Sequence, residues 1–427
     1  MEVKAGYKQT EVGIIPEDWE VKILGEIVQY TNGKAHENSI NEFGKYIVVN
    51  SKFISTDGEV KKYSDECFSP TAKGEILMVM SDVPNGRAIA RCFFVEHNDT
   101  YTVNQRICTI RQSQINGRLL FYKLNRNPYY LAFDDGVKQT NLRKNDVLSC
   151  PIPCPPTLLE QEAIAEALSD ADALIESLEQ LITKKRQIKQ GTMQELLTGK
   201  TRLEGFRNKS GFKQTDIGMI PEDWEAVNLS EVVKKFQNGY AFSSVGYVKS
   251  GMPIVTMAQI GLDGTFQFDE QVVNYWSFQE GSHLIDFQIF RGDLIIAMTD
   301  VTPEKNLIGR MTVVIEIGPL LLNQRVGLLR LNPEKIIPYF LCAFSNSSIW
   351  RSYSQAVASL GVQANIGTKE IRLGKVPLPT LLEQQAIASV LSDMDSEITA
   401  LESKLEKARQ VKHGMMHNLL TGRIRLV

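Results

Sequence analysis

The chain has 427 residues, which exceeds the length of one ordinary domain and predicts two to four domains. Its 43% hydrophobic and 23% charged residues are typical of a globular protein, and no stretch approaches the roughly 18 uninterrupted apolar residues of a membrane helix. The net charge of −3 gives no sign of nucleic-acid binding across the whole chain, so a DNA reader of this composition would need locally basic faces or a basic partner.

The first twenty residues carry charged side chains and no apolar core, so we expect no signal peptide and a cytoplasmic protein. Residues 8–20 read KQTEVGIIPEDWE and recur at 213–225 as KQTDIGMIPEDWE, with ten of thirteen positions identical. The segment TLLEQEAIA at 157–165 recurs as TLLEQQAIA at 380–388, and each copy leads to Leu-Leu-Thr-Gly, at 196–199 and 419–422. Three such pairs in the same order indicate an internal duplication. We call these repeated segments the frame.

Two stretches between the frame segments, 21–150 and 226–375, are far less alike. Short β-branched runs and helical stretches alternate in both of them. The expected strands include 46–49, 76–79 and 294–297, and the expected helices include 119–124 and 337–344. Each stretch is long enough to bury its own core. The two stretches therefore predict two mixed α/β domains.

Short motifs recur inside these stretches in the same order. The pairs are Ser81-Asp82 with Thr299-Asp300, Asn104-Gln105-Arg106 with Asn323-Gln324-Arg325, and Gln139-Thr140-Asn141-Leu142 with Gln363-Ala364-Asn365-Ile366. The rest of the two stretches differs. This pattern predicts two copies of one fold that present different surfaces.

The repeated segments after each Pro-rich edge predict long helices. Their apolar residues advance by four and three positions in alternation, which is the spacing of a coiled-coil seam. The seam comprises Ile164, Leu168, Ala171, Ile175, Leu178 and Ile182 in the first helix, and Ile387, Leu391, Met394, Ile398, Leu401 and Leu405 in the second. Prolines are expected to mark where the two helices begin, and Gly199 and Gly422 where they end, which gives helices of about 40 residues and roughly 60 Å.

Charge along the first helix indicates how the two helices pair. Every charged residue from 158 to 182 is acidic, and basic residues follow, so an antiparallel pair would place acidic beginnings against basic ends. We therefore predict an α+β protein with two globular mixed α/β domains in a pseudo-two-fold arrangement, separated by two long helices that form an antiparallel coiled coil. The alternative is that each helix packs on its own domain.

The ordered set of motifs resembles the specificity subunits of Type I restriction-modification systems. The resemblance rests on Pro-Glu-Asp-Trp at 16–19 and 221–224, on the segments 136–142 and 361–366, and on Leu-Glu-Gln at 159–161 and 382–384. It covers essentially the whole chain. It implies a first target-recognition domain at 1–155, a spacer helix at 156–205, a second target-recognition domain at 206–378 and a second spacer helix at 379–427.

The resemblance also implies a sequence-specific DNA-recognition subunit. Each target-recognition domain would read one half of a bipartite target in double-stranded DNA, while the helices set the spacing and dock two modification subunits. Restriction subunits with helicase and endonuclease activity would complete the complex. The chain itself would catalyse nothing and hold no cofactor or metal, because S-adenosylmethionine for adenine methylation, ATP and Mg²⁺ are expected on the partner subunits.

The residues themselves offer no competing chemistry. The sequence contains no Gly-x-Gly-x-x-Gly, no Walker A loop and no Asn/Asp-Pro-Pro-aromatic tetrapeptide. Glu20-Val21-Lys22 has nuclease-like spacing but no suitably placed Asp before it, and His413 with His417 lacks a third metal ligand, so we expect structural roles. The six cysteines, including Cys150 and Cys154, show no zinc-ligand spacing and are expected to be reduced apolar residues.

Base-reading residues should lie where the two domains differ and where polar or basic side chains gather in loops. The candidates are Asn85, Arg87, Lys138, Arg143 and Lys144 in the first domain, and Lys305, Asn306, Arg310, Gln363 and Lys369 in the second. A feature common to both domains cannot explain two different targets. We therefore interpret the two Asn-Gln-Arg motifs as frame or phosphate contacts, and we expect Trp19 and Trp224 to pack against a strand rather than stack on bases.

The basic surplus of the two stretches is small. Residues 21–150 hold 17 basic and 14 acidic residues, and residues 226–375 hold 13 and 12. We infer that partner subunits would supply much of the clamp around DNA. Two other functions remain open from the sequence: a two-headed structural adaptor that binds protein partners, and an orphan specificity cassette without cognate partners.

Overall fold

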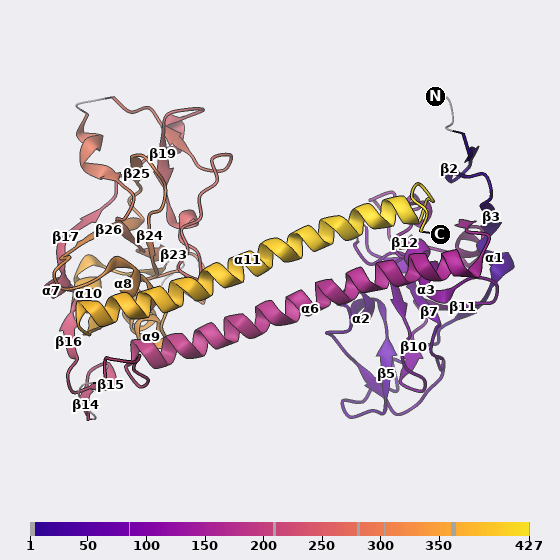
Figure 1. Cartoon of the computed structure of the whole chain (residues 1–427), viewed down its shortest axis with the longest axis horizontal. Coiled ribbons are helices and arrows are strands. Elements are labelled where there is room, and N and C mark those ends of the chain that lie inside the picture. The colour runs from indigo at the N-terminus through magenta and orange to yellow at the C-terminus, as the bar shows by residue number, and fades with distance from the viewer. Residues whose placement is uncertain are drawn as a thin grey trace. The chain divides into compact units, whose positions relative to one another are not determined.

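A computed structural model describes residues 5–84, 86–207, 211–279, 282–302, 304–359 and 364–426. The chain divides into two compact units (Figure 1). Unit 1 comprises Met1–Glu179 together with Ser403–Val427, and unit 2 comprises Gln180–Glu402. Both ends of the chain therefore belong to unit 1. Among the described residues, no helix is both long and apolar enough to cross a membrane.

Unit 1 is a mixed α/β domain built on a four-stranded sheet in the order β4-β11-β7-β9, with a three-stranded sheet β10-β5-β6 beside it. Its strands are β1 (Tyr7–Thr10), β2 (Gly13–Pro16), β3 (Glu20–Ile23), β4 (Val28–Asn32), β5 (Tyr46–Val49), β6 (Tyr63–Ser64), β7 (Ile76–Val79), β8 (Ser81–Asp82), β9 (Cys92–Phe94), β10 (Tyr101–Val103), β11 (Ile107–Gln112), β12 (Thr140–Asn141) and β13 (Pro151–Cys154). Its short helices are α1 (Leu24–Ile27), α2 (Ser51–Ser55), α3 (Gly117–Leu124), α4 (Pro128–Leu131) and α5 (Lys144–Leu148).

Unit 2 repeats this plan, with the four-stranded order β17-β26-β22-β24 and a larger second sheet, β18-β20-β19-β25-β21. Its strands are β14 (Phe212–Thr215), β15 (Gly218–Pro221), β16 (Glu225–Asn228), β17 (Val233–Asn238), β18 (Tyr247–Val248), β19 (Met252–Val255), β20 (Tyr275–Trp276), β21 (Gln288–Ile289), β22 (Leu294–Ala297), β23 (Thr299–Asp300), β24 (Met311–Val313), β25 (Leu320–Leu322), β26 (Val326–Leu331), β27 (Ala364–Asn365) and β28 (Lys375–Leu378). Its short helices are α7 (Leu229–Val232), η1 (Ser244–Gly246), η2 (Met257–Gln259), η3 (His283–Phe287), α8 (Pro338–Ser345), α9 (Ser348–Val357) and α10 (Thr368–Leu373).

The strands expected at 46–49, 76–79 and 294–297 are confirmed with those bounds as β5, β7 and β22. The expected helices coincide with α3 and α8 to within two residues at either end. All four residues of β7, and all four of β22, are buried. These two strands lie at inner positions of their sheets, so continuous apolar runs fit them.

Two long helices, α6 (Leu158–Leu197) and α11 (Leu381–Leu419), extend from the globular parts, and the prediction of a long antiparallel pair is confirmed. In unit 2 the end of α6 lies beside the beginning of α11 (Figure 1), where Lys185 binds Glu397 at 2.6 Å. In unit 1 the beginning of α6 lies beside the end of α11, where Glu179 binds Arg409 at 2.6 Å. Gly199 and Gly422 follow the two helices with φ of +68° and +70°, a conformation that favours glycine at a helix end.

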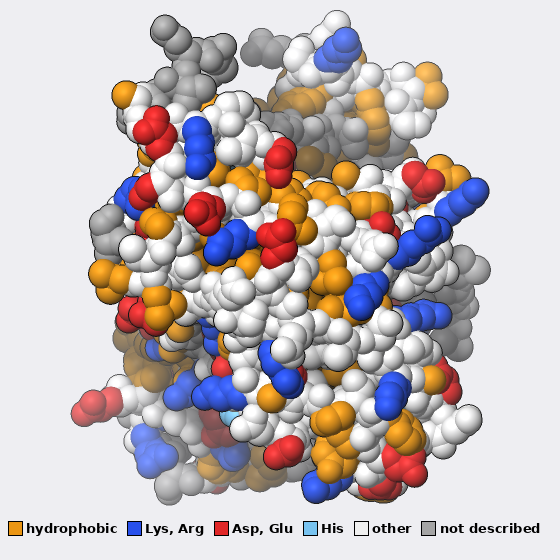
Figure 2. Space-filling view, turned by 90° about the vertical axis from the view of Figure 1, so that its right-hand side faces the viewer, with side chains coloured by type: hydrophobic (Ala, Val, Ile, Leu, Met, Phe, Trp, Pro, Cys, Tyr) orange, Lys and Arg blue, Asp and Glu red, His pale blue; other side chains and the backbone are white. Residues whose placement is uncertain are grey.

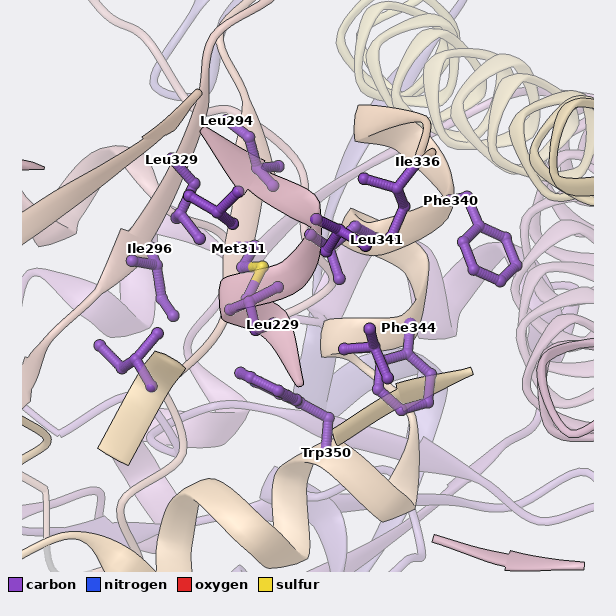
Figure 3. Packing of buried hydrophobic residues seen from close by; sticks show 14 of the residues in the cluster. Leu229, Leu294, Ile296, Met311, Leu329, Ile336, Phe340, Leu341, Phe344 and Trp350 are labelled. Carbon is purple, nitrogen blue, oxygen red and sulfur yellow. The ribbon is translucent and has the colours of Figure 1, made fainter. Parts of the chain in front are cut away.

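Each unit has its own core, and each long helix contributes its first turns to one of them. In unit 2, Leu294 and Leu329 of the sheet lie beside Ile336 and Leu341 (Figure 3), and Ile387 and Leu391 of α11 belong to the same cluster. In unit 1, Ile164 and Leu168 of α6 join the corresponding cluster. The alternative interpretation, that each helix packs on its own domain, therefore holds for the first turns of the helices.

The frame motifs recur because they bind one another within each unit. In unit 2, Glu383 accepts a 2.7 Å bond from Arg202 and a 3.0 Å bond from the indole of Trp224. Gln384 accepts from the N–H of Ile337 at 3.0 Å and so fixes the beginning of α8. Arg202 also binds Asp223 at 2.9 Å. Leu-Glu-Gln is therefore a structural joint between a long helix and its domain.

Unit 1 builds a corresponding joint from the two ends of the chain, except that the buried Nε1 of Trp19 has no hydrogen-bond partner among the described residues. Arg425, which follows Gly422 as closely as Arg202 follows Gly199, binds Glu160 at 2.7 Å and Asp18 at 3.0 Å. Gln161 accepts from the N–H of Asn116 at 2.8 Å, at the beginning of α3. Trp19 is fully buried, as is Trp224, so their expected packing role is confirmed.

Candidate nucleic-acid interface

A backbone ladder in unit 1 brings together three segments that are far apart in the sequence. The N–H of Met80 donates to the carbonyl of Arg106 at 3.0 Å, and the N–H of Leu142 donates to the carbonyl of Met80 at 2.8 Å. Immediately beyond this point β8 pairs with β12, which places Asp82 opposite Thr140. The Asn-Gln-Arg turn, the Ser-Asp strand and the Gln-Thr-Asn-Leu segment therefore lie side by side.

The polar side chains of these segments bind one another at the surface. The hydroxyl of Ser81 donates to Asn141 Oδ1 at 2.6 Å and accepts from the amide of Gln139 at 2.7 Å. Lys144 Nζ lies 5.7 Å from the ring centre of Tyr30, within the range of a cation–π contact. We define the polar face of unit 1 as the exposed side chains of these segments and of the chain that adjoins them. It comprises Asn32, Lys34, Arg87, Gln105, Arg106, Lys138, Gln139, Asn141, Arg143 and Lys144.

Unit 2 has the same ladder with different side chains. The N–H of Met298 donates to the carbonyl of Arg325 at 3.0 Å, and the N–H of Ile366 donates to the carbonyl of Met298 at 2.9 Å. Here β23 pairs with β27. The polar face of unit 2 is defined by the corresponding exposed or half-buried residues. It comprises Asn238, Tyr240, Glu304, Asn306, Gln324, Arg325, Asn365, Thr368 and Lys369.

Most of the candidates from the sequence fall on these faces. Arg87, Lys138, Arg143 and Lys144 are exposed in unit 1, and Asn306 and Lys369 are exposed in unit 2. Asn85 and Gln363 lie outside the described residues. The ladder thus brings together residues from the loop after β8 or β23, from β12 or β27, and from the start of α5 or α10.

Arg310 and Lys305 are placed differently from the others. The N–H of Ala297 donates to the carbonyl of Arg310, just as the N–H of Val79 donates to the carbonyl of Arg91, so Arg91 is the structural counterpart of Arg310. The Nε of Arg310 donates to the carbonyl of Asn306 at 2.6 Å, and burial lowers its pKa. Lys305 is half-buried and turns towards α9, where Nζ lies 3.5 Å from the carbonyl of Gln355. Neither the guanidinium of Arg310 nor the ammonium of Lys305 therefore lies fully on the polar face of unit 2.

Sequence reasoning missed the residues at the end of β4 and of β17. A Cβ on Gly33 would lie 2.1 Å from the carbonyl oxygen of Asn104, and one on Gly239 would lie 2.2 Å from that of Asn323. The chain therefore passes directly against the Asn-Gln-Arg turn, which brings Asn32 and Lys34, or their counterparts, onto the polar face. The repeated Asn-Gly dipeptides at 32–33 and 238–239 were the signal for this approach.

In each Asn-Gln-Arg motif the asparagine has a structural role, and the glutamine and arginine are exposed. Asn104 Oδ1 accepts from the N–H of Arg106 at 3.4 Å, and Asn323 Oδ1 accepts from that of Arg325 at 3.2 Å. The asparagines therefore shape the turn, and the glutamines and arginines that follow them are exposed.

Three acidic residues near the polar face of unit 1 accept hydrogen bonds, Glu37 from the side-chain amide of Gln105 and the other two from main-chain groups. Asp135 accepts from the N–H of Val137 at 2.9 Å and of Lys138 at 3.1 Å, and these bonds lower the pKa of its carboxyl. Asp146 accepts from the N–H of Arg143 at 2.7 Å. The face of unit 1 carries six basic side chains (Lys34, Arg87, Arg106, Lys138, Arg143 and Lys144), and that of unit 2 carries Arg325 and Lys369. The electrostatic bias is therefore stronger in unit 1.

This bias is local. On the side of the chain shown in Figure 2, Lys and Arg side chains are interspersed with Asp and Glu among wide uncharged areas. The net charge of −3 fits this mixture. The described residues on this side of the chain therefore form no continuous basic surface that would attract any polyanion.

The predicted seam residues of the long helices are buried or half-buried throughout. Ile164, Leu168, Leu178, Ile182, Ile387, Leu391 and Ile398 are buried, and Ala171, Ile175, Met394, Leu401 and Leu405 are half-buried. Ion pairs flank the seam within each unit. They are Lys185–Glu397, Arg186–Glu402 and Lys189–Asp395 in unit 2, and Glu179–Arg409 and Asp172–Lys412 in unit 1.

Other features of the described residues offer little chemistry. They contain no group of three His, Cys, Asp or Glu side chains placed to hold a metal ion. Burial raises the pKa of Cys108 to about 12 and that of Cys150 to about 11, which keeps both thiols protonated. Glu20 and Lys22 lie 4.0 Å apart on β3, and His413 and His417 are exposed on α11. A groove of about 790 Å³ in unit 2, between α6, α11 and residues 260–267, lies away from the ladder.

Comparison with known proteins shows to which family this duplicated fold belongs. The Type I restriction modification DNA specificity domain matches the chain twice, at residues 16–190 and 221–409. The chain belongs to this family of Type I restriction-modification specificity subunits. The members of this family are the subunits that supply DNA specificity in such systems and are not themselves catalytic.

Individual relatives resemble the chain along most of its length. It is 28% identical to the Type I restriction enzyme MjaVIII specificity subunit of Methanocaldococcus jannaschii over 96% of this chain and 94% of that one. It is 23% identical to the Type I restriction enzyme EcoBI specificity subunit of Escherichia coli over 74% of this chain and 67% of that one. The crystal structure of the S subunit of the Type I restriction-modification system of M. genitalium has the same fold, with a TM-score of 0.59, 16% identity and 98% of each chain covered.

Proposed function

We propose that the two polar faces each bind one half of a bipartite target in double-stranded DNA. The observation that carries this proposal is the ladder, which recurs in both units and holds unlike side chains on the same backbone. Arg and Lys can bind guanine, and Asn and Gln can bind adenine, in the major groove. Two copies of one scaffold with different side chains suit two different half-sites.

We propose that the chain acts through partner subunits in the cytoplasm. The frame presents the same structural joint twice, which suits two copies of one partner, namely a modification subunit that methylates adenine with S-adenosylmethionine. Restriction subunits that use ATP and Mg²⁺ would complete the assembly. The small basic surplus of residues 21–150 and 226–375 supports a division of labour, in which partners supply part of the phosphate contact.

We propose that α6 and α11 set the spacing between the half-sites. The buried seam, together with the flanking ion pairs, fixes one register within each unit, so the two helices cannot slide independently. Seven residues inserted after Ile182, with seven more after Glu402, should lengthen the DNA spacer by about 3 base pairs, since 7 residues rise by about 10 Å. The same insertion in α6 alone shifts the ion pairs out of register and should destabilise the protein.

The decisive experiment combines the chain with the modification subunits of its host and maps methylated adenines on a library of random DNA. A split target that requires the chain supports the proposal. Replacement of 226–375 by the corresponding segment of another specificity subunit should change one half-site and leave the other. Methylation without sequence preference, or DNA-independent capture of other proteins by the two polar faces, would instead favour an adaptor.

A further inference from the structure

Each unit carries a loop that contributes to its polar face, at residues 83–87 in unit 1 and 301–306 in unit 2. Residues 85 and 303 lie outside the described part of the chain. The two loops differ in length and in sequence, yet both begin in the same way. Val83 is 65% exposed and Val301 is 64% exposed, although both are apolar. The backbone therefore turns the first side chain of each loop outward to the same degree.

In unit 1 a carboxylate holds the two ends of the loop together. Asp82 Oδ1 accepts from the N–H of Val83 at 2.9 Å, and Oδ2 accepts from the N–H groups of Ala88 at 2.6 Å and Ile89 at 3.0 Å. A Cβ on Gly86 would lie 2.1 Å from Asp82 Oδ2, so the close approach requires glycine there. Both carboxylate oxygens are therefore used as acceptors for main-chain groups.

Unit 2 uses its carboxylate in the same way. Asp300 Oδ1 accepts from the N–H of Thr302 at 2.8 Å and from its hydroxyl at 2.9 Å, and Oδ2 accepts from the N–H of Leu307 at 2.5 Å. Burial opposes ionisation of Asp300, but these bonds outweigh it and lower the pKa. The charged form thus holds the loop at its two ends.

An arginine binds the carbonyls that follow or lie within each loop. Arg126 Nη1 lies 3.2 Å from the carbonyl of Ile89 and 3.4 Å from that of Arg87. In unit 2, Arg351 donates to the carbonyls of Ile308 and Lys305, the latter at 2.8 Å. Arg126 follows α3 and Arg351 belongs to α9, so the two units reach one arrangement from different positions in the sequence.

Each loop is therefore held from two sides, with its N–H groups on a carboxylate and its carbonyls on a guanidinium. We call the pairs Asp82 with Arg126, and Asp300 with Arg351, the loop clasps. Because the clasps bind main-chain groups, they constrain the backbone of the described residues at the ends of each loop and leave the side chains of Arg87, Glu304 and Asn306 exposed to solvent. An exposed side chain on a fixed backbone loses little entropy on binding and can be selective for one base edge.

We propose, on the basis of the DNA-recognition function above, that Arg87 in unit 1 and Glu304 with Asn306 in unit 2 read bases, and that Asp82 and Asp300 are positioning residues for one half-site each. Arg87 has the donors for guanine. Asn306 suits adenine, and Glu304 can accept from the amino group of cytosine. The two loops would therefore select different bases, although their backbones are held in the same way.

The test uses the full chain with its modification subunits and a DNA library in which each base of each half-site is substituted singly. Asp82→Asn keeps the size of the side chain but turns an NH₂ group towards an N–H, so only one of the two acceptor positions survives. We expect methylation of substituted sites, relative to the cognate site, to rise at least tenfold for one half-site only. Asp300→Asn should do the same for the other half-site.

Two controls separate positioning from stability. Asp57→Asn and Asp293→Asn change carboxylates that bind Arg91 and Arg330 outside the loops, and both should leave discrimination unchanged. Arg87→Ala alters only an exposed side chain, so it reports on the loop even if Asp82→Asn fails to fold, and it should relax the same half-site.

The outcomes are distinct. If the unaltered complex recognises a split target but Arg87→Ala and Asp82→Asn retain full discrimination, the loops are not readers and the inference is overturned. Equal relaxation of both half-sites by either loop variant would also overturn it, because each clasp serves one unit. If the unaltered complex shows no sequence preference, the DNA-recognition function itself fails.

Discussion

Gly422 lies against Pro16, although the two residues stand near opposite ends of the chain: a Cβ on Gly422 would lie 2.6 Å from Cγ and Cδ of the proline ring. In unit 2, Gly199 lies against Pro221 in the same manner, with the Cβ position 2.4 Å from Cγ. The Gly199–Pro221 contact closes a short connection, whereas the Gly422–Pro16 contact joins the two ends of the chain. The same pair of repeated motifs therefore forms the same joint by local and by long-range folding.

Substitution Gly422→Ala should destabilise unit 1 strongly. The φ of +70° strains any L side chain by about 1–2 kcal/mol, and the added Cβ overlaps a rigid ring, so we expect a total loss of about 2 kcal/mol or more. Urea denaturation measures the loss. Gly205→Ala is the matched control, because Gly205 has a φ of +88° with nothing within 4 Å of the Cβ position. Equal losses in the two variants would show that the Gly422–Pro16 contact is not tight.

Removal of Arg202 should cost more stability than removal of Arg425. The side chain of Arg202 is 6% exposed and that of Glu383 is 2% exposed, so Arg202→Gln leaves a buried carboxylate without its charge partner, at a cost of about 3–5 kcal/mol. Glu160, the partner of Arg425, is as buried as Glu383, but the side chain of Arg425 is 32% exposed, so water can enter where Arg425→Gln removes the guanidinium and can bind the carboxylate in its place. Chemical denaturation of both variants gives the order.

Arg409→Gln provides the baseline for these two variants. Its ion pair with Glu179 is about half exposed on both sides and should contribute only about 0–1 kcal/mol. A loss for Arg202→Gln no larger than that of Arg409→Gln would contradict the importance of the buried joint.

Lys123→Met should stabilise the protein at neutral pH. Lys123 is buried beside Trp19, donates to the carbonyl of Leu420 at 2.8 Å, and burial lowers its pKa to about 7. Between that value and the unfolded pKa of about 10.4 the unfolded state binds more protons, so the stability of the unaltered chain should rise with pH in this window. The seventh position of α8, which corresponds to Lys123 in α3, is the buried Phe344.

The gain from Lys123→Met should be greatest below pH 7, of the order of a few kcal/mol, and should shrink towards pH 10. Thermal midpoints recorded across pH 6–10 would measure it. The exposed Lys52→Met should leave the pH profile as it is. A constant difference between Lys123→Met and the unaltered chain at every pH would show that Lys123 does not titrate in this range.

The polar face of unit 1 should carry more of the salt dependence of DNA binding than that of unit 2. Neutralisation of Lys34, Arg106 and Lys144 to Gln should reduce the slope of log affinity against log salt by about 2–3, close to 0.9 for each phosphate that the variant no longer neutralises. Arg325 and Lys369 in unit 2 should together account for about 2 at most. Binding of a fixed duplex to the complex with its modification subunits, titrated at several salt concentrations, measures both.

Lys45, Lys61 and Lys62 serve as a control for that experiment, because they are exposed in unit 1 but lie outside its polar face. Their replacement by Gln removes the same charge from the same unit. An equal fall in slope for the two triple variants would show that general charge, rather than this face, attracts the DNA.

The sequence by itself determined the duplication, the bounds of β5, β7 and β22, and the two long helices. Each of these features is encoded locally, in a repeated motif or in the spacing of apolar residues along one element. The sequence also singled out Asp82 and Asp300 as a recurring pair, but nothing in it indicated that their carboxylates hold loops.

Only the tertiary structure decided which polar residues share a surface. The ladder through Met80 and Met298 joins segments separated by many residues, and the main-chain bonds of Val79 and Ala297 make Arg91 the counterpart of Arg310. The tertiary structure also shows that Arg126 and Arg351 both donate to carbonyls at the loops, although they lie at unrelated positions in the sequence. The physical reason is that backbone pairing and burial depend on which distant segments meet, and periodicity along a single element carries no record of that choice.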